Sequence, residues 1–203
     1  PVLSYAPGTP ERSALKAALG AVGAQQIEIP AVVAGREVRT GDTHDVVSPH
    51  CHHRVLAKVH QADAATIEAA TKAAVEAQRD WGHWRFEDRA AVFLKAAELL
   101  ATVHRQLLNA ATMLGQSKTA FQAEIDSACE LIDFLRFNVH YAERIYREQP
   151  ESAAGPWNRL DHRPLEGFVY AITPFNFTAI GGNLPTAPAL MGNAVVWKPA
   201  GSA

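Results

Sequence analysis

Two short apolar runs near the carboxyl end of the chain most constrain its fold. One reads GFVYAIT from Gly167 and the other AVVWKP from Ala194, and both contain β-branched and aromatic residues. The stretch between them, TAIGGNLPTAPALMGN, has helical potential around Pro188 to Met191. Continuous apolar runs are typical of strands buried in a parallel sheet, and parallel neighbours need a crossover connection. We therefore predict a βαβ unit, the start of a doubly wound α/β sheet that needs further strands to be complete.

Three helices are predicted before this unit. DAATIEAATKAAVEAQRDW opens with a capping Asp63 and is broken at Trp81-Gly82, and FEDRAAVFLKAAELLATVHRQL follows it. The third segment runs from Thr119 to Glu148 and carries apolar residues at alternating spacings of four and three, which is the period of an amphipathic helix. This predicted stripe consists of Phe121, Ile125, Ala128, Ile132, Leu135 and Val139.

The remaining segments look less regular. The first 60 residues are punctuated by Pro and Gly, and we predict a loose lead-in with an edge hairpin in IEIPAVVAGREVRT that turns at Gly35-Arg36. PESAAGPWNRLDHRP, after Gln149, predicts a loop or short hairpin. The expected divisions are 1–148 for the lead-in and helical part, 149–165 for the loop, and 166–203 for the start of the sheet.

Composition excludes several classes of partner. The 19 basic and 21 acidic residues give a net charge of -2, which offers no electrostatic basis for binding nucleic acid or an anionic membrane. No apolar run approaches the roughly 20 residues that span a bilayer. Cys51 and Cys129 lie in sequence contexts that differ from each other, so we expect no disulfide framework and a reducing, cytoplasmic location. From the charge balance we expect a small-molecule or protein partner.

Two polar residues follow the predicted strands and are candidates for a site. Asn176 and Lys198 both lie where ligands bind in open parallel sheets, beyond the carboxyl ends of the strands. An amide can donate hydrogen bonds to a developing oxyanion, and an ammonium can hold ribose or phosphate oxygens. Polar residues also commonly end buried strands, and no G-x-G-x-x-G motif is present, so the spacing alone favours a structural role.

The identities of these residues add a resemblance. TPFNFTAIGGNLPTAPALMGNAVVWKPA resembles the start of the cofactor-binding domain of the aldehyde dehydrogenase superfamily. With Phe175 in place of Trp, the run is similar to the branch that oxidises Δ1-pyrroline-5-carboxylate. TMLGQSKTAFQAEIDSACELIDFLRFN and PWNRLDHRPLEGFVYAITPFNF resemble the same branch, so the similarity extends from about Asp63 onward.

The resemblance implies roles for the residues at the strand ends. Asn176 corresponds to the family's oxyanion-hole asparagine, and Lys198 to the lysine that holds the adenosine ribose of NAD. Gly201 stands where many relatives carry an acidic residue for the ribose hydroxyls, which leaves preference for NAD over NADP open. The segment that lies along the cofactor corresponds to the backbone of Ile172, Thr173, Pro174 and Phe175.

The resemblance also implies a substrate pocket. Phe177 corresponds to an aromatic wall of the aldehyde pocket, and Glu130 to a helix carboxylate near the substrate's amino group. The open alternatives are a solvated helix face for Glu130, or Glu124 or Asp126 as the relevant acid if the register differs.

The implied reaction is the NAD-dependent oxidation of L-glutamate γ-semialdehyde to L-glutamate, the second step of proline degradation. In the family a cysteine thiolate attacks the aldehyde and a glutamate activates water, and both come from the second half of such enzymes. We therefore expect an N-terminal portion that is inactive alone and homo-oligomeric in the full-length enzyme. The alternatives are another aldehyde dehydrogenase subfamily, or a non-catalytic remnant whose sheet edge binds a partner subunit.

The histidine cluster and Cys129 are predicted to have no role in a functional site. His50, Cys51, His52 and His53 are adjacent, whereas zinc ligands come as spaced pairs from two segments, so we predict a surface loop and no metal site. Cys129 lies beside the apolar stripe, where we expect an inert, small buried hydrophobe.

Overall fold

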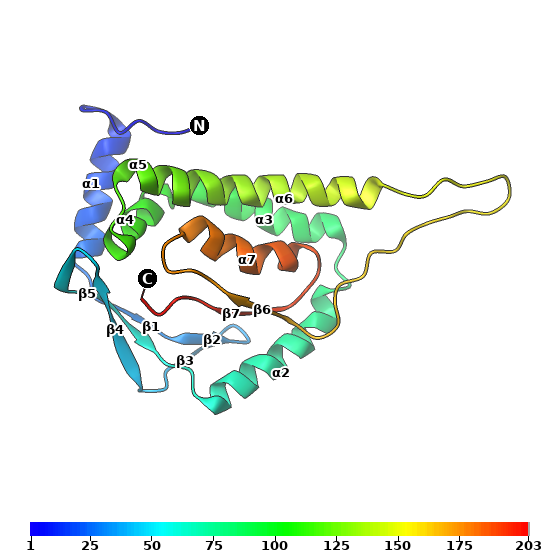
Figure 1. Ribbon diagram of the computed structural model, residues 1–203, viewed down its shortest axis with the longest axis horizontal. Helices are drawn as coiled ribbons and strands as arrows, with labels where there is room; N and C mark the ends of the chain where they lie inside the picture. Colours follow the sequence, from blue (N-terminus) through cyan, green and yellow to red (C-terminus); the bar gives the residue numbers. More distant parts are fainter. Residues whose placement is uncertain (203) are drawn as a thin grey trace.

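The computed structural model describes residues 1–202 and layers helices over a short parallel sheet (Figure 1). The helices α3 (Phe86–Ala101) and α6 (Glu130–Arg147) lie side by side and contact each other. Both contact α7 (Thr178–Leu190), which in turn packs on β6 (Val169–Ile172) and β7 (Val195–Lys198). The helix α7 therefore lies between the helical layer and the sheet.

The predicted βαβ unit is confirmed. Strands β6 and β7 pair in parallel, with a register that runs from Val169 opposite Val195 to Ile172 opposite Lys198. The crossover helix α7 is longer than its local sequence suggested and contains Pro185 and Pro188. The bond from the Val169 N–H to the Ala194 carbonyl, 2.9 Å long, extends the pairing at its start.

The first predicted helix is confirmed and the second divides into two. Helix α2 (Ala64–Trp81) starts at Asp63, whose carboxylate accepts the Thr66 N–H at 2.7 Å. The second prediction is wrong in its length, because α3 ends at Ala101 and α4 (Arg105–Gln116) begins after a short break. Thr102 ends α3 with non-helical φ and ψ of -118° and -84°, and its hydroxyl donates to the Glu98 carbonyl at 2.8 Å.

The third predicted helix contains a π-helical turn. Helix α5 (Ala120–Ala123) is followed by the π turn η1 (Glu124–Cys129), and α6 continues from Glu130. A π turn holds more residues than an α turn, so it rotates the residues on either side relative to each other. Phe121 is consequently 70% exposed and does not belong to the buried stripe, although Ile132 and Leu135 do.

The expectation of a loose lead-in over the first 60 residues is wrong. Helix α1 (Pro10–Gly23) starts with a proline in its first turn and a first-turn acid at Glu11, both favourable at a helix N-terminus. A three-stranded sheet follows, in the order β1 (Ile27–Ile29), β5 (Cys51–His60), β4 (Thr43–Ser48). Strand β5 includes Cys51, His52 and His53 of the cluster that we expected in a loop, whereas His50 lies in the turn before this strand.

The predicted hairpin is confirmed with a shifted turn. Strands β2 (Ala31–Val33) and β3 (Arg36–Val38) pair antiparallel. The turn residues are Ala34 and Gly35, with φ of 50° and 74°, rather than Gly35 and Arg36. A two-residue turn with two positive φ values suits the twist of a hairpin, and here an alanine takes one of these strained positions.

Residues 148–168, between α6 and β6, form the predicted loop. They contain no helix or strand, and the loop projects away from the helices at the right of Figure 1. Trp157 on this loop is 76% exposed.

The helices α6 and α7 approach each other closely at one glycine. A Cβ atom on Gly182 would lie 2.5 Å from the Leu131 Cδ1 atom, and Leu131 is itself buried. Farther along, the Asn138 side chain donates to the Asn183 side chain at 2.8 Å. The start of α6 is thus fixed against the first turns of α7.

A buried carboxylate joins three segments just before the start of α6. Glu124, the first residue of the π turn, is 0% exposed and forms an ion pair with Arg105 on α4. It also accepts the Tyr5 hydroxyl at 2.8 Å, the Asn109 amide at 2.9 Å and the Leu3 N–H at 2.8 Å. Burial alone would raise the pKa of Glu124, but these hydrogen bonds, led by that of Arg105, lower it.

The neighbouring glycines of α7 provide a matched pair of stability tests. Gly182→Ala forces a methyl group against the Leu131 side chain, so we expect a loss of about 1–3 kcal/mol in the free energy of unfolding. Gly181→Ala meets nothing within 4 Å and should stabilise the helix by about 0.5–1 kcal/mol. Urea unfolding measures both, and equal effects would contradict the close α6–α7 contact.

Truncation of the buried carboxylate tests the network around Glu124. Glu124→Ala leaves the Arg105 guanidinium buried and unpaired, so we expect a loss of about 3–5 kcal/mol. Glu68→Ala breaks only an exposed pair with Lys72 and should cost about 0.5 kcal/mol or less.

The effect of Glu124 should depend on pH in a defined direction. Its pKa is lower in the folded protein than in the unfolded chain, so its contribution is complete above the unfolded pKa of about 4.3 and is lost as the pH falls further. Urea unfolding of the wild type and of Glu124→Ala should therefore differ less at acid pH than at pH 7. A constant difference would show that the ionised form is not what the network binds.

Candidate functional site

The parallel register brings the two predicted strand ends to one edge of the sheet. Ile172 lies opposite Lys198, and the Thr173 N–H donates to the Lys198 carbonyl at 3.3 Å. The Trp197 indole N–H donates to the Thr173 hydroxyl at 3.0 Å, which ties the two segments together. The sequence prediction that residues following β6 and β7 share an edge is confirmed.

This edge presents an open strip of backbone and apolar side chains. Thr173 is buried, whereas Ile172 and Phe175 are each 61% exposed and Trp197 is 50% exposed. The side chains of Lys198 and Asn176 are also exposed. Flat apolar surface beside an ammonium group is the chemistry that the rings and ribose hydroxyls of a nucleotide require.

The start of α7 is anchored to the end of α4. Phe177 is the N-cap residue of α7, with extended φ and ψ of -147° and 94°. The next residue, Thr178, bonds through its hydroxyl to the Thr112 hydroxyl and to the Gln116 amide, both at 2.8 Å. Asn176 therefore lies between a strand end and a fixed helix start, which holds its backbone in place.

Lys118 connects the aromatic residue Phe177 with the carboxylates of the π turn. Its Nζ lies 4.7 Å from the centroid of the Phe177 ring and 2.7 Å from Asp126 Oδ2. Burial raises the pKa of the partly buried Glu130, the charges of Asp126 and Asp133 raise it further, and the charge of Lys118 lowers it. Lys118 thus contacts the predicted pocket residue Phe177, and its charge acts on the other predicted pocket residue, Glu130.

The three candidate acids have different surroundings. The Glu124 carboxylate is already bound by the buried network around Arg105. Asp126 is paired with Lys118. Among residues 1–202, Glu130 makes no ion pair within 4 Å, so it is the acid of the three whose charge is available to a ligand.

Sequence reasoning missed Lys118, Arg105 and Tyr5. One signal was readable: Thr119 and Gln122 have the spacing of a capping box, which the structure contains and which places the start of α5 directly after Lys118. The contacts of Arg105 and Tyr5 join segments more than a hundred residues apart, and no local pattern announces them.

Gly201, which stands where many relatives carry an acidic residue, lies beside His44 of β4. The His44 ring donates through Nε2 to the Gly201 carbonyl at 2.6 Å, so β4 supports the turn that follows β7. A Cβ atom on residue 201 would lie 3.2 Å from that nitrogen.

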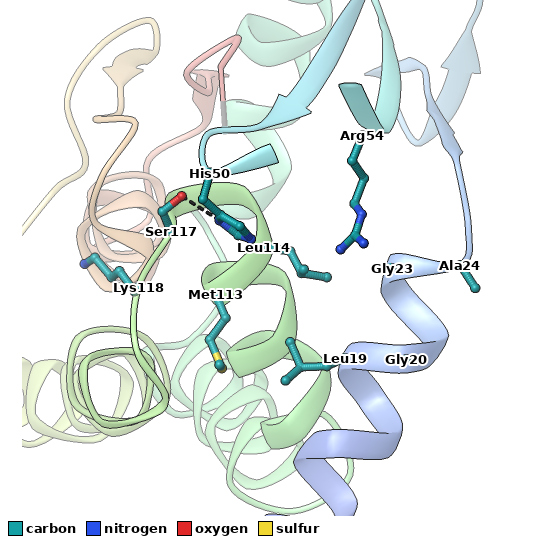
Figure 2. Close-up of a pocket in the computed structure, with 10 residues that line it drawn as sticks. All are labelled: Leu19, Gly20, Gly23, Ala24, His50, Arg54, Met113, Leu114, Ser117 and Lys118. Atoms are coloured by element: carbon teal, nitrogen blue, oxygen red, sulfur yellow. Dashed lines mark hydrogen bonds between the residues drawn. The ribbon is translucent and has the colours of Figure 1, made fainter. Parts of the chain in front are cut away.

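His50 of the histidine cluster borders an open cleft of about 630 Å³ (Figure 2). The cleft lies between α1 and the end of α4, with Leu19, Met113 and Leu114 as apolar walls and Arg54 directed into it. His50 Nδ1 lies 2.8 Å from the Ser117 hydroxyl. No group of three His, Cys, Asp or Glu side chains suited to a metal ion occurs among the described residues.

The two cysteines are free thiols. Cys129 is partly buried, and burial, together with the charge of Glu124, raises its pKa. A raised pKa disfavours the reactive thiolate, in line with the inert role that we expected. In the described part of the chain, none of the helices is long and apolar enough to cross a membrane.

The sequence of the chain is similar to a known protein family and to individual relatives. The sequence profile of the aldehyde dehydrogenase family matches residues 37–203. The Δ1-pyrroline-5-carboxylate dehydrogenase of Agaricus bisporus is 53% identical over 100% of this chain, and the mitochondrial enzyme of Dictyostelium discoideum is also 53% identical over 100% of it. The chain spans 38% and 37% of the lengths of these relatives.

A solved structure agrees with this relationship. The Δ-pyrroline-5-carboxylate dehydrogenase of Mycobacterium tuberculosis bound with NAD is 55% identical and superimposes with a TM-score of 0.96, covering 98% of this chain and 38% of that one. The expected aldehyde dehydrogenase-like fold is thereby confirmed. The chain belongs to the aldehyde dehydrogenase family.

Proposed function

We propose that this chain contributes to the NAD-dependent oxidation of L-glutamate γ-semialdehyde, the open form of Δ1-pyrroline-5-carboxylate, to L-glutamate in proline degradation. The observation that carries the proposal is the identity of 53% over the whole chain with a Δ1-pyrroline-5-carboxylate dehydrogenase. The chain spans 38% of that relative, so the proposal concerns the natural enzyme that contains this sequence.

Asn176 is proposed to stabilise the oxyanion that forms when a thiolate attacks the aldehyde carbon. Its position between the end of β6 and the N-cap of α7 supports this role, because hydrogen bonds hold Thr173 on one side of it and Thr178 on the other. A donor that is already oriented loses little freedom in the transition state, which is what makes such hydrogen bonds effective.

The open strip of residues 172–175 is proposed to lie along NAD, with Lys198 at the adenosine ribose. The exposed Ile172 and Phe175 side chains and the exposed ammonium of Lys198 fit a ligand that combines flat rings with ribose hydroxyls. When bound, NAD supplies the hydride acceptor for the oxidation. The protein's part is to hold this group against the sheet edge.

Glu130 and Phe177 are proposed to form the side of the pocket that distinguishes an amino-bearing aldehyde. A carboxylate without an ion-pair partner among residues 1–202 can accept hydrogen bonds from the substrate's ammonium group. The Phe177 ring, which packs against the main hydrophobic core, supplies an apolar wall for the aldehyde chain.

We also propose the three divisions at 1–148, 149–165 and 166–203, with the projecting loop as a contact between copies in a homo-oligomer. The exposed Trp157, Leu160 and Leu165 side chains on or beside this loop support that contact. A cytoplasmic location stays a prediction, and the Dictyostelium discoideum relative is described as mitochondrial.

The role of Asn176 is tested in the natural enzyme by steady-state NAD reduction with Δ1-pyrroline-5-carboxylate. Asn176→Ala should lower kcat about 10²- to 10³-fold, because one oxyanion donor is lost, while KM changes little. Gln26→Ala removes an exposed amide far along the chain and serves as the control. An unchanged kcat for Asn176→Ala would contradict the assignment.

The role of Lys198 is tested by titrating NAD against the enzyme's intrinsic fluorescence. Lys198→Met removes an ammonium from the ribose site, so we expect the Kd for NAD to rise about tenfold, or about 1.4 kcal/mol. Lys16→Met, an exposed lysine on α1, should leave the Kd unchanged. If both variants bind NAD as the wild type does, Lys198 has only a structural place at the strand end.

A further inference from the structure

Lys118 occupies a backbone position that is fixed on both sides. Ser117, which ends α4, has φ and ψ of 55° and 36°, in the left-handed region that non-glycine residues rarely adopt. Thr119, directly after Lys118, opens α5 with a complete capping box in which its hydroxyl accepts the Gln122 N–H. Lys118 is the single residue between these two caps, which leaves it little freedom to move.

The side chain of Lys118 is directed away from the neighbouring cleft. In Figure 2 it extends away from Met113 and Leu19, although its stem lines the cleft. The side chain is only 13% exposed, and that of its partner Asp126 only 26%. A mostly buried ammonium must be compensated, and here Asp126 and the face of the Phe177 ring do so.

The same ammonium balances a surplus of negative charge around Glu130. Asp126 and Asp133, one helical turn before and nearly one turn after it, are the carboxylates that act on Glu130. Burial and both of these charges favour the neutral acid, and Lys118 is the cation that opposes them. A neutral Glu130 would bind a substrate ammonium much less strongly than a carboxylate does.

We propose that Lys118 is a positioning residue that fixes the Phe177 ring and balances the carboxylate charge around Glu130, so that this pocket selects aldehydes that carry an amino group. The inference rests on the proposed function, which places Glu130 beside the substrate's ammonium. It adds a residue whose effect is transmitted through Glu130 and Phe177 rather than through a contact of its own with the reacting atoms.

The test compares two substrates of the natural enzyme across a range of pH. One is L-glutamate γ-semialdehyde and the other is 5-oxopentanoate, which has the same chain length and no amino group. Lys118→Met keeps the length of the side chain and removes its charge. We expect kcat/KM for the amino-bearing substrate to fall about tenfold on the acid side of its pH profile, where the ionised fraction of Glu130 limits it, and by less at neutral pH.

The pH dependence gives a signature that a merely structural role would not produce. Loss of Lys118 raises the pKa of Glu130 further, so the acid limb of the kcat/KM profile for the amino-bearing substrate should move to higher pH. The profile for 5-oxopentanoate should not move in this way. Lys118→Arg should restore the wild-type profile in large part, and Lys72→Met, an exposed lysine on α2, should change neither substrate's profile.

The opposite charge change provides a second variant if Lys118→Met fails to fold. Asp126→Asn removes a carboxylate that acts on Glu130 and releases Lys118 from its pair, so the acid limb should move to lower pH. A limb that stays in place or moves to higher pH in Asp126→Asn would overturn the inference.

Failure of the inference and failure of the proposed function have different outcomes. A wild-type enzyme that does not prefer the amino-bearing substrate contradicts the proposed function itself. A wild-type enzyme that shows the preference, together with a folded Lys118→Met variant that keeps both the preference and the pH profile, overturns the role of Lys118 alone.

Discussion

The arrangement of the helices depends on the ion pair and hydrogen bonds of the buried Glu124 carboxylate. A carboxylate that is 0% exposed is tolerated only because Arg105, Tyr5, Asn109 and the Leu3 N–H all bond to it. These partners come from the N-terminal segment and from α4, whereas Glu124 itself begins the π turn that leads into α6. The network therefore sets where α6 starts and which way its first residues face.

On its helical side, the candidate site depends on this placement of the start of α6. On its other side, it depends on the register of β6 and β7. The π turn ends at Cys129, directly before Glu130, and the α6–α7 contact at Gly182 holds that helix start against the helix that follows Phe177. The pairing of Ile172 with Lys198 brings the strand ends together independently. The pocket and the cofactor strip thus meet at residues 176–178, where β6 leads into α7.

The sequence predicted the parts of the fold that depend on local patterns. Apolar runs separated by a crossover predicted the parallel pair, and the Asp63 cap predicted the start of α2. The π turn was not predicted, because the spacing of Phe121 and Ile125 fits an ordinary α-helix. The three-stranded sheet was also missed: the parallel pairing of β1 with β5 joins distant segments, and the local β4–β5 hairpin is interrupted by register shifts at Val46 to Ser48.

The site was predictable to a similar extent. Asn176 and Lys198 could be placed at one edge from topology alone, but Lys118 lies in a short connection whose importance depends on contacts with other elements.

We propose that Glu130 and Asn176 face the two ends of one amino-bearing substrate. A crystal structure of the natural enzyme with the product L-glutamate tests it most directly. We expect the ammonium about 3 Å from the Glu130 carboxylate and the γ-carboxylate about 3 Å from the Asn176 amide. An L-glutamate bound with its ammonium on other residues would contradict it.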